Sequence, residues 1–273
     1  MSSPDLGIGR RYLTETRYSR EGLGEPRRVY PRAPLYKEYP QAQPRLSLKA
    51  EARPQPMDLW QCLAQRRSQR HYQERPLTQS ELAALLWATQ GVTLTGHTYL
   101  LRAAPSAGAL YPVETYVAVH QVTGLTPGIW HFQVPDFSLE LVREGDCRRP
   151  LVAAGLSQNF LGAASAVFIW TGVLNRAMWK YRERAIRYLF LDAGHICQNL
   201  MLAATALNLG VCPVGAFFDG EVEQLLEVDA QQEPALYLAA VGPLALSGFW
   251  GGWARDHLQK SPCPPPTPPS QPA

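Results

Sequence analysis

The stretch YLFLDAGHICQNLMLAATALNL, residues Tyr188–Leu209, is the longest apolar-rich segment of this 273-residue chain. Apolar side chains recur in it at helical spacing, at Leu189, Ala193, Ile196, Leu200, Ala203, Ala204 and Leu207. Four polar residues interrupt the run, which excludes a membrane span: Asp192, His195, Gln198 and Asn199. The spacing therefore predicts one long helix with a stripe that faces the core, stopped by Gly210.

Shorter elements flank this helix in no regular order. Alternating or continuous apolar runs predict strands at Val113–His120, Gly128–Gln133, Ser138–Val142, Ser165–Val173 and Ala235–Val241. Helices are predicted after Asp58, which can cap one, after Thr78, whose spacing to Glu81 suits a capping box, and at Glu221–Glu227. Gly91 is expected to end the second of these. Because strands and helices do not alternate as βαβ units, we expect an α+β fold.

The chain is expected to divide into three parts. Residues 1–56 are rich in proline and arginine, which predicts an irregular N-terminal extension, solvated rather than bound to nucleic acid. Residues 57–250 form the folded domain. Residues 251–273 are a proline-rich tail whose composition favours disorder over a role as a ligand for an aromatic groove.

Composition excludes several classes of function. A net charge of +3 is too small to indicate a nucleic-acid or membrane partner. The polar, arginine-rich beginning contains no secretory signal, and five scattered cysteines suit a reducing cytoplasm rather than a disulfide framework. Neither the cysteines nor the histidines have metal-ligand spacing, so no metal is expected.

Two segments have the residue types that a phosphate-bearing planar cofactor requires. Arg66-Arg67-Ser68-Gln69-Arg70 gathers guanidinium groups, which bind phosphate through paired charge-assisted hydrogen bonds. The loop Pro105–Pro112 contains small residues that leave backbone groups free to reach a ring. A basic helix end and an ordinary turn are the alternative interpretations, and both stay open at this point.

Two further segments are weaker candidates. Gly210–Phe217 exposes backbone amides, or merely joins the long helix to the next segment. Lys180 and Tyr181 can act as proton acceptors in a suitable environment, or belong to a charged helix start on a solvated face. Asp192 and His195, on the long helix, are expected to be a satisfied buried polar pair rather than catalytic groups.

The chain resembles the nitroreductase superfamily of flavoproteins, and within it the SagB-type dehydrogenases, which include thiazole- and oxazole-forming peptide oxidases. The segments that carry the resemblance are, in order, TRYSRE, PLYKEYP, RRSQRHY, LLWATQGVT, RAAPSAGALYP, GIWHF, KYRERAIRYLFLDAGHICQNLMLAA, LGVCPVGAF and YLAAVGP. The N-terminal segments and the Lys180–Tyr181 pair favour the SagB branch. Two departures are Ala109, where many nitroreductases have asparagine, and the segment around Arg255 and Lys260, which does not align with the family's C-terminal basic pair.

The resemblance implies FMN as the cofactor, a nitroreductase-like fold with a mixed, mostly antiparallel sheet wrapped by helices, and a homodimer with the flavin at its interface. By motif position, Arg66, Arg67, Ser68 and Arg70 would hold the phosphate and ribityl chain. Ring contacts would come from Pro105, Ser106, Ala107 and Ala109 of the second subunit, from Pro213, Val214, Gly215 and Ala216, and from Gln158. Lys180 and Tyr181 match the pair linked to catalysis in azoline-oxidising members.

The implied reaction is FMN-dependent dehydrogenation of an azoline ring to an azole in a modified peptide, with Lys180 or Tyr181 as the base. The implied partners are a cyclodehydratase and a precursor peptide. Three alternatives remain: an NAD(P)H-dependent nitro or quinone reductase, another two-electron oxidation of a small metabolite or cyclic peptide, and a non-catalytic flavin-binding scaffold subunit.

Overall fold

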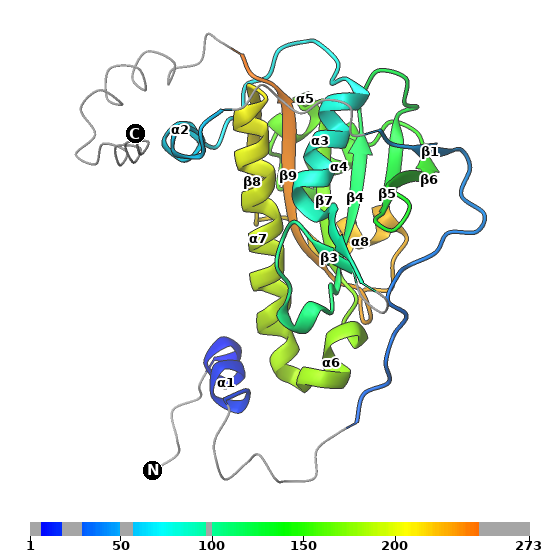
Figure 1. The fold of residues 1–273 in the computed structure, drawn as a ribbon, viewed down its shortest axis with the longest axis vertical. Coiled ribbons are helices and arrows are strands. Elements are labelled where there is room, and N and C mark those ends of the chain that lie inside the picture. Colours follow the sequence, from blue (N-terminus) through cyan, green and yellow to red (C-terminus); the bar gives the residue numbers. More distant parts are fainter. Residues whose placement is uncertain (1–6, 18–28, 50–56, 97–99, 246–273) are drawn as a thin grey trace, which may run out of the picture.

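A seven-stranded sheet forms the centre of the protein (Figure 1). The computed structural model describes residues 7–17, 29–49, 57–96 and 100–245. The strand order is β1-β6-β5-β4-β7-β9-β8, and every pairing between these strands is antiparallel. Their bounds are β1 Arg45–Ser47, β4 Val113–Val119, β5 Gly128–Gln133, β6 Ser138–Glu144, β7 Ala166–Gly172, β8 Leu209–Val214 and β9 Ala235–Pro243. Parallel pairing occurs, within the described ranges, only as isolated bridges such as Ser68–Val211.

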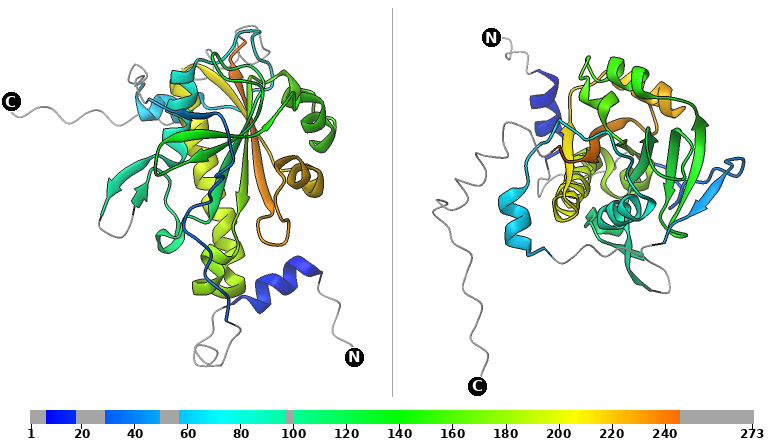
Figure 2. Two further views of the ribbon diagram at one scale, coloured as in Figure 1. Left: turned by 90° about the vertical axis from the view of Figure 1, so that its right-hand side faces the viewer. Right: turned by 90° about the horizontal axis from the view of Figure 1, so that it is seen from above.

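Helices cover both faces of this sheet, as the view from above in Figure 2 makes clear. One face carries α3 (Gln79–Gln90) and α7 (Ala185–Ala206), and the other carries α4 (Arg148–Ala154), α5 (Phe160–Ala163) and α8 (Asp219–Leu226). Val117 of β4 faces the first layer and Tyr116 the second, so the central strand is buried on both sides. The predicted α+β class with a mostly antiparallel, helix-covered sheet is confirmed.

The long helix predicted from the apolar stripe is confirmed as α7, with two corrections at its ends. It begins at Ala185 rather than Tyr188, and it ends at Ala206. Asn208, at φ 55°, takes the left-handed conformation just after the helix, two residues before the Gly210 that we expected to stop it, because asparagine also tolerates that region. Gly210 instead lies inside β8, so the segment predicted as a connection is largely an edge strand. None of the described helices is long and apolar enough to cross a bilayer.

The predicted caps are confirmed. Asp58 accepts hydrogen bonds from the backbone of Trp60 and Gln61 at the start of α2 (Leu59–Gln65). Thr78 and Glu81 form the capping box of α3, which ends at Gly91. Several elements are too short to show a clear sequence pattern and were not predicted. They are α6 (Asn175–Tyr181) and the two-stranded ribbon of β2 (Val92–Thr95) and β3 (Leu100–Arg102).

The N-terminal extension is more ordered than its proline content predicts. It contains α1 (Ile8–Glu15) and β1, which pairs with the edge strand β6. Residues 29–49, which we call the strap, run across the sheet and are fastened by their backbone: Arg176 Nε donates to the Pro34 carbonyl at 2.6 Å. The domain boundaries stay a prediction, since residues 18–28, 50–56 and 246–273, the proline-rich tail included, lie outside the described residues.

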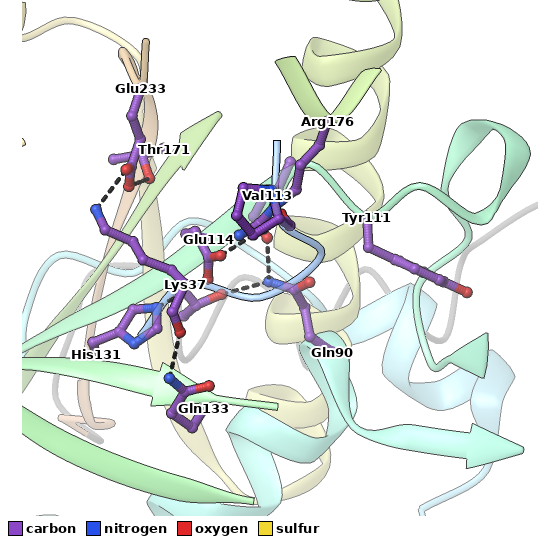
Figure 3. Close-up of polar contacts among 12 residues, drawn as sticks. Lys37, Gln90, Tyr111, Val113, Glu114, His131, Gln133, Thr171, Arg176 and Glu233 are labelled. Atoms are coloured by element: carbon purple, nitrogen blue, oxygen red, sulfur yellow. Dashed lines mark hydrogen bonds and ion pairs between the residues drawn. The ribbon is translucent and has the colours of Figure 1, made fainter. Parts of the chain in front are cut away.

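Lys37 fastens the strap through its side chain (Figure 3). Its ammonium donates to Glu233 and to the Tyr116 hydroxyl, the latter at 2.7 Å, while Gln133 binds its carbonyl. Thr171 also donates to Glu233, at 2.8 Å. Because the carboxylate is buried, these donors offset the cost of removing its charge from water.

A second buried cluster links the central sheet to α6. Glu114 on β4 lies 2.5 Å from Arg176 Nη1 and 2.9 Å from His131 Nε2, and all three side chains are buried. Burial alone would raise the pKa of Glu114, but Arg176 and His131 outweigh it and lower the value to about 2. Burial lowers the pKa of His131, yet its contacts with Glu114 and Glu140 raise it overall.

We predict that Glu114→Gln lowers the free energy of unfolding by about 3–5 kcal/mol, because Arg176 is left buried without its carboxylate. In the wild type, the contribution of Glu114 is present above the ordinary glutamate pKa of 4.5 and is lost as the pH falls towards about 2. The variant should therefore lose part of this acid dependence. Urea unfolding at several pH values measures both effects, and Glu144→Gln, at the exposed end of β6, is the control. Equal stability of the two variants would contradict the prediction.

Candidate active site

The arginine cluster follows α2 directly, as the sequence predicts. Arg66 caps the helix, and Arg67 Nη1 donates to the carbonyls of Ala64 and Arg66 at 2.9 and 2.7 Å. In the described part of the chain, Arg66, Arg67 and Arg70 form no ion pair with a carboxylate. Their positive charge is therefore available to an external anion.

The arginine cluster adjoins two other predicted segments. The Gln69 amide donates to the Val211 carbonyl at 2.8 Å, which ties the cluster to β8. The guanidinium of Arg70 lies 5.7 Å from the centre of the Phe160 ring. Gln158 Nε2 donates to the Ala216 carbonyl at 3.0 Å. We call residues 66–70, 158 and 213–216 the arginine half-site.

The small-residue loop has an unusual backbone that Asp192 holds in place. Gly108, Ala109 and Tyr111 have φ values of 64°, 53° and 46°. Residues other than glycine rarely adopt this backbone conformation. Ser106 Oγ donates to Asp192 Oδ2 at 2.6 Å and accepts from the Tyr111 amide at 3.0 Å. Burial raises the pKa of Asp192, although the hydrogen bonds that it accepts from Ser106 and from the Ala107 amide oppose the shift.

Lys180 and Tyr181 lie against this loop. They are the last two residues of α6, which corrects the alternative interpretation of a helix start. A Cβ at Gly108 would come 2.4 Å from Tyr181 Oη and 2.7 Å from Lys180 Nζ, so a larger residue there would displace the ends of these two side chains. The Tyr181 ring also meets Tyr188 edge-on, with centroids 4.8 Å apart. We call residues 105–112 and 180–181 the loop half-site.

A pocket of about 550 Å³ opens beside the loop half-site. Gly108, Ala109 and Lys180 line it on one side, and Arg32 and Tyr36 of the strap on another. Arg102 of β3 also lines it. Arg32, Tyr36 and Arg102 were not predicted as site residues, although Tyr36 belongs to PLYKEYP and Arg102 begins RAAPSAGALYP. Their place at the pocket depends on burial and on contacts between distant segments, which residue type does not reveal.

The two half-sites lie towards opposite ends of α7 (Figure 1). Arg67 lines one small cavity with Met201 and Thr205 near the end of the helix, whereas Ser106 binds Asp192 in its first half. At 1.5 Å per residue, the 13 residues from Asp192 to Thr205 span about 20 Å. Within one chain, therefore, the residues of each half-site lie together, but the two half-sites do not meet. The prediction that the loop reaches the ring from a second subunit stays a prediction.

One polar expectation on α7 is corrected. Asp192 is buried and hydrogen-bonded, but His195 is exposed, so the two do not form a buried pair. Three residues turn a helix by about 300°, so His195 lies only about 60° around the axis from Asp192, just outside the buried stripe. Arg255 and Lys260 lie outside the described residues.

The chain belongs to the nitroreductase family, whose profile matches residues 63–242. A protein of Methanocaldococcus jannaschii that is named as a nitroreductase is 37% identical over 180 residues, 66% of this chain and 88% of that protein. The trifolitoxin-processing protein TfxB of Rhizobium leguminosarum bv. trifolii is 32% identical over 168 residues, 56% of this chain and 42% of that protein.

Solved structures show the same fold. A nitroreductase structure from Anabaena variabilis superposes with a TM-score of 0.71 and 29% identity, covering 90% of this chain and 49% of that one. A chain of the E. coli microcin synthetase McbBCD complex, which has truncated pro-MccB17 bound, superposes with a TM-score of 0.57 and 16% identity, covering 90% and 85%. This chain thus spans less than half of TfxB and of the Anabaena protein.

We predict that Asp192→Ala loosens the small-residue loop, because Ser106 and the Ala107 amide lose their acceptor. A hydrogen bond to a charged group contributes about 1.5–3 kcal/mol, so the Tyr111 amide should exchange its hydrogen at least about tenfold faster. Hydrogen exchange followed by mass spectrometry measures this. His195→Ala, exposed on the same helix, is the control, and unchanged exchange in the aspartate variant would contradict the role of Asp192.

Proposed function

We propose that this protein is an FMN-dependent oxidoreductase of the SagB type that dehydrogenates an azoline ring to an azole in a modified peptide. The observation that carries the proposal is the contact of Lys180 and Tyr181 with the small-residue loop at the wall of a pocket. Removal of a proton from a ring that lies on this loop requires a base beside the loop, and Lys180 and Tyr181 lie there. The resemblance to a trifolitoxin-processing protein supports a peptide substrate.

The residues of the arginine half-site fit FMN. Their guanidinium groups have no carboxylate partner within the described residues, which suits a phosphate. The Cβ built on Gly215 meets one atom within 4 Å, Tyr237 Cε2 at 3.7 Å, so this backbone is open to close approach. Arg66, Arg67, Ser68 and Arg70 would hold the phosphate and ribityl chain, while residues 213–216 and Gln158 would contact the ring. When bound, FMN supplies an acceptor for two electrons.

Lys180 and Tyr181 would handle the proton. The hydrogen on the ring carbon next to the carbonyl is the acidic one, and Lys180 Nζ or Tyr181 Oη would accept it. Both groups are near Gly108, so a ring lying on the loop would present this hydrogen to them. Arg176, on the same helix as the pair, is held by Glu114 and positions α6.

A homodimer would bring the two half-sites together. α2 leaves Leu59, Trp60 and Leu63 exposed, and α7 leaves Phe190 and Leu191 exposed at 57% each. Large apolar side chains on two neighbouring helices suit a protein interface. In such a dimer, Pro105, Ser106, Ala107 and Ala109 of one subunit would reach the ring held by the arginine half-site of the other. A cyclodehydratase and a precursor peptide are the further partners that we propose.

A second candidate function is reduction of nitro or quinone compounds by NAD(P)H. The name of the Methanocaldococcus relative favours it. This reaction uses the same flavin site but needs no base at Lys180. Rapid reduction of the bound flavin by NADPH, with turnover that is insensitive to replacement of Lys180, would support this candidate over azoline dehydrogenation.

We predict that Lys180→Ala retains bound FMN but dehydrogenates an azoline-containing peptide at least about a hundredfold more slowly, as expected for loss of a general base. Tyr181→Phe tests the phenol in the same way. Product formation is followed by mass spectrometry, as a loss of two hydrogens, and flavin content by absorbance. Arg149→Ala, on the exposed surface of α4, is the control. Normal turnover by both variants would show that the pair is not the base.

We predict that Arg70→Gln weakens FMN binding by about 10- to 100-fold, because one charge-assisted contact with the phosphate is lost. Fluorescence quenching of FMN during titration of the apoprotein measures the affinity. Arg75→Gln removes an equal charge from an arginine that is already paired with Glu81, and it should bind FMN like the wild type. Equal affinities of the two variants for FMN would contradict the proposal that Arg70 binds the phosphate.

A further inference from the structure

Arg102, at the end of β3, carries a buried charge without a counter-ion. It is 8% exposed, and its Nη1 donates to Gln90 Oε1 at 2.6 Å, while its Nε has no hydrogen-bond partner. Within the part of the chain that the structure describes, no carboxylate forms an ion pair with it. A buried cation that lacks such a partner is costly to the folded state, which indicates that an anion from outside the chain completes the site.

Glu114, the acid whose charge acts on Arg102, already has other partners. The Glu114 carboxylate stabilises the charged form of Arg102. Its two oxygens, however, bind Arg176 at 2.5 Å and His131 at 2.9 Å. Its charge is therefore shared between two other groups. Gln90 offers a neutral oxygen, which accepts a hydrogen bond but does not neutralise the guanidinium.

The pocket that Arg102 lines is positive throughout. Arg32 and Lys180 line the same space of about 550 Å³, and its lining includes no aspartate or glutamate among the described residues. The two guanidinium groups, of Arg32 and Arg102, have no fixed negative charge beside them among the described lining residues, so they raise the local concentration of anions. The volume suits a small molecule or the end of a larger one.

Aromatic rings give this pocket a preference for flat ligands. The Arg102 guanidinium lies 4.5 Å from the centre of the Tyr111 ring and 5.9 Å from that of Tyr36. Arg32 lies 4.9 Å from the centre of the Trp179 ring. Aromatic faces stack on planar groups, and Nη2 of Arg102 has no hydrogen bond within the described residues, so it remains for a carboxylate.

We propose that this pocket is a carboxylate-binding subsite in which Arg102 pairs with a carboxylate attached to the flat five-membered ring of the substrate. The choice of ring rests on the proposed function, which this inference deepens. The substrate class is an azoline whose ring carries a free carboxylate, as at the C-terminal end of a peptide. Lys180, on the wall of the same pocket, then lies on the side of the ring that bears the carboxyl carbon.

The test measures binding affinity by isothermal titration calorimetry. The FMN-loaded full chain is titrated with two probes, thiazole-4-carboxylate and thiazole-4-carboxamide. The wild type should bind the carboxylate at least about tenfold more tightly than the amide, because only the carboxylate pairs with the guanidinium. Arg102→Gln should bind both equally. Arg149→Gln loses the same charge from an exposed position and should retain the wild-type preference.

Several outcomes would overturn this inference: no binding of the carboxylate by the wild type, equal binding of the two probes, or a preference that survives in Arg102→Gln. Loss of FMN from Arg102→Gln would assign the guanidinium to the coenzyme and overturn it as well. If the wild type prefers the carboxylate with or without flavin but never dehydrogenates an azoline, the subsite stands and the proposed function fails.

A measurement of stability guards against an unfolded variant. Because Arg102 has no ion-pair partner in the described residues, Arg102→Gln should melt at the wild-type temperature or above it. If it does not fold, Arg102→Lys replaces it, since lysine keeps the charge but not the paired donors. A preference reduced severalfold in Arg102→Lys supports the subsite, and an unchanged preference overturns it.

Discussion

The ion pair of Arg176 with Glu114 is the interaction on which the geometry of the candidate site depends. Glu114 belongs to the central strand β4, and Arg176 belongs to α6, whose last residues are Lys180 and Tyr181. The same arginine binds the Pro34 carbonyl of the strap. One buried guanidinium therefore fixes the sheet, the helix and the strap together, so the Lys180–Tyr181 pair and the pocket wall are positioned by one network.

The long helix α7 imposes a second constraint. It places the arginine half-site near one end and the loop half-site towards the other, about 20 Å apart at 1.5 Å per residue. Side chains cannot close this distance, and the rigid helix does not bend to do so. In the homodimer that we propose, two copies would assemble a complete flavin site from these half-sites, and the exposed apolar residues of α2 and α7 support that proposal.

The sequence predicted the fold where strong local signals existed. The apolar stripe of α7, the capping box at Thr78 and the alternation in β4 each correspond to an observed element. It failed where tertiary contacts decide the structure: β1 forms because β6 offers an open edge, and Asn208 rather than Gly210 ends α7. Residue type and spacing singled out the segments of both half-sites, but their assignment to a flavin, and Gln158 as a candidate, came from the resemblance to nitroreductases. Arg102 and the strap were not, since their role depends on burial and on contacts between distant segments.

Because of the strap, the folded structure begins earlier in the chain than the region that matches the family profile. The family match begins at residue 63, whereas Lys37, Arg32 and Tyr36 lie before it. A fragment trimmed to the matched region would expose Glu233 without its ammonium partner and would remove one wall of the pocket. The wall that residues 29–49 supply to the pocket is thus built from outside the part of the chain that defines the family.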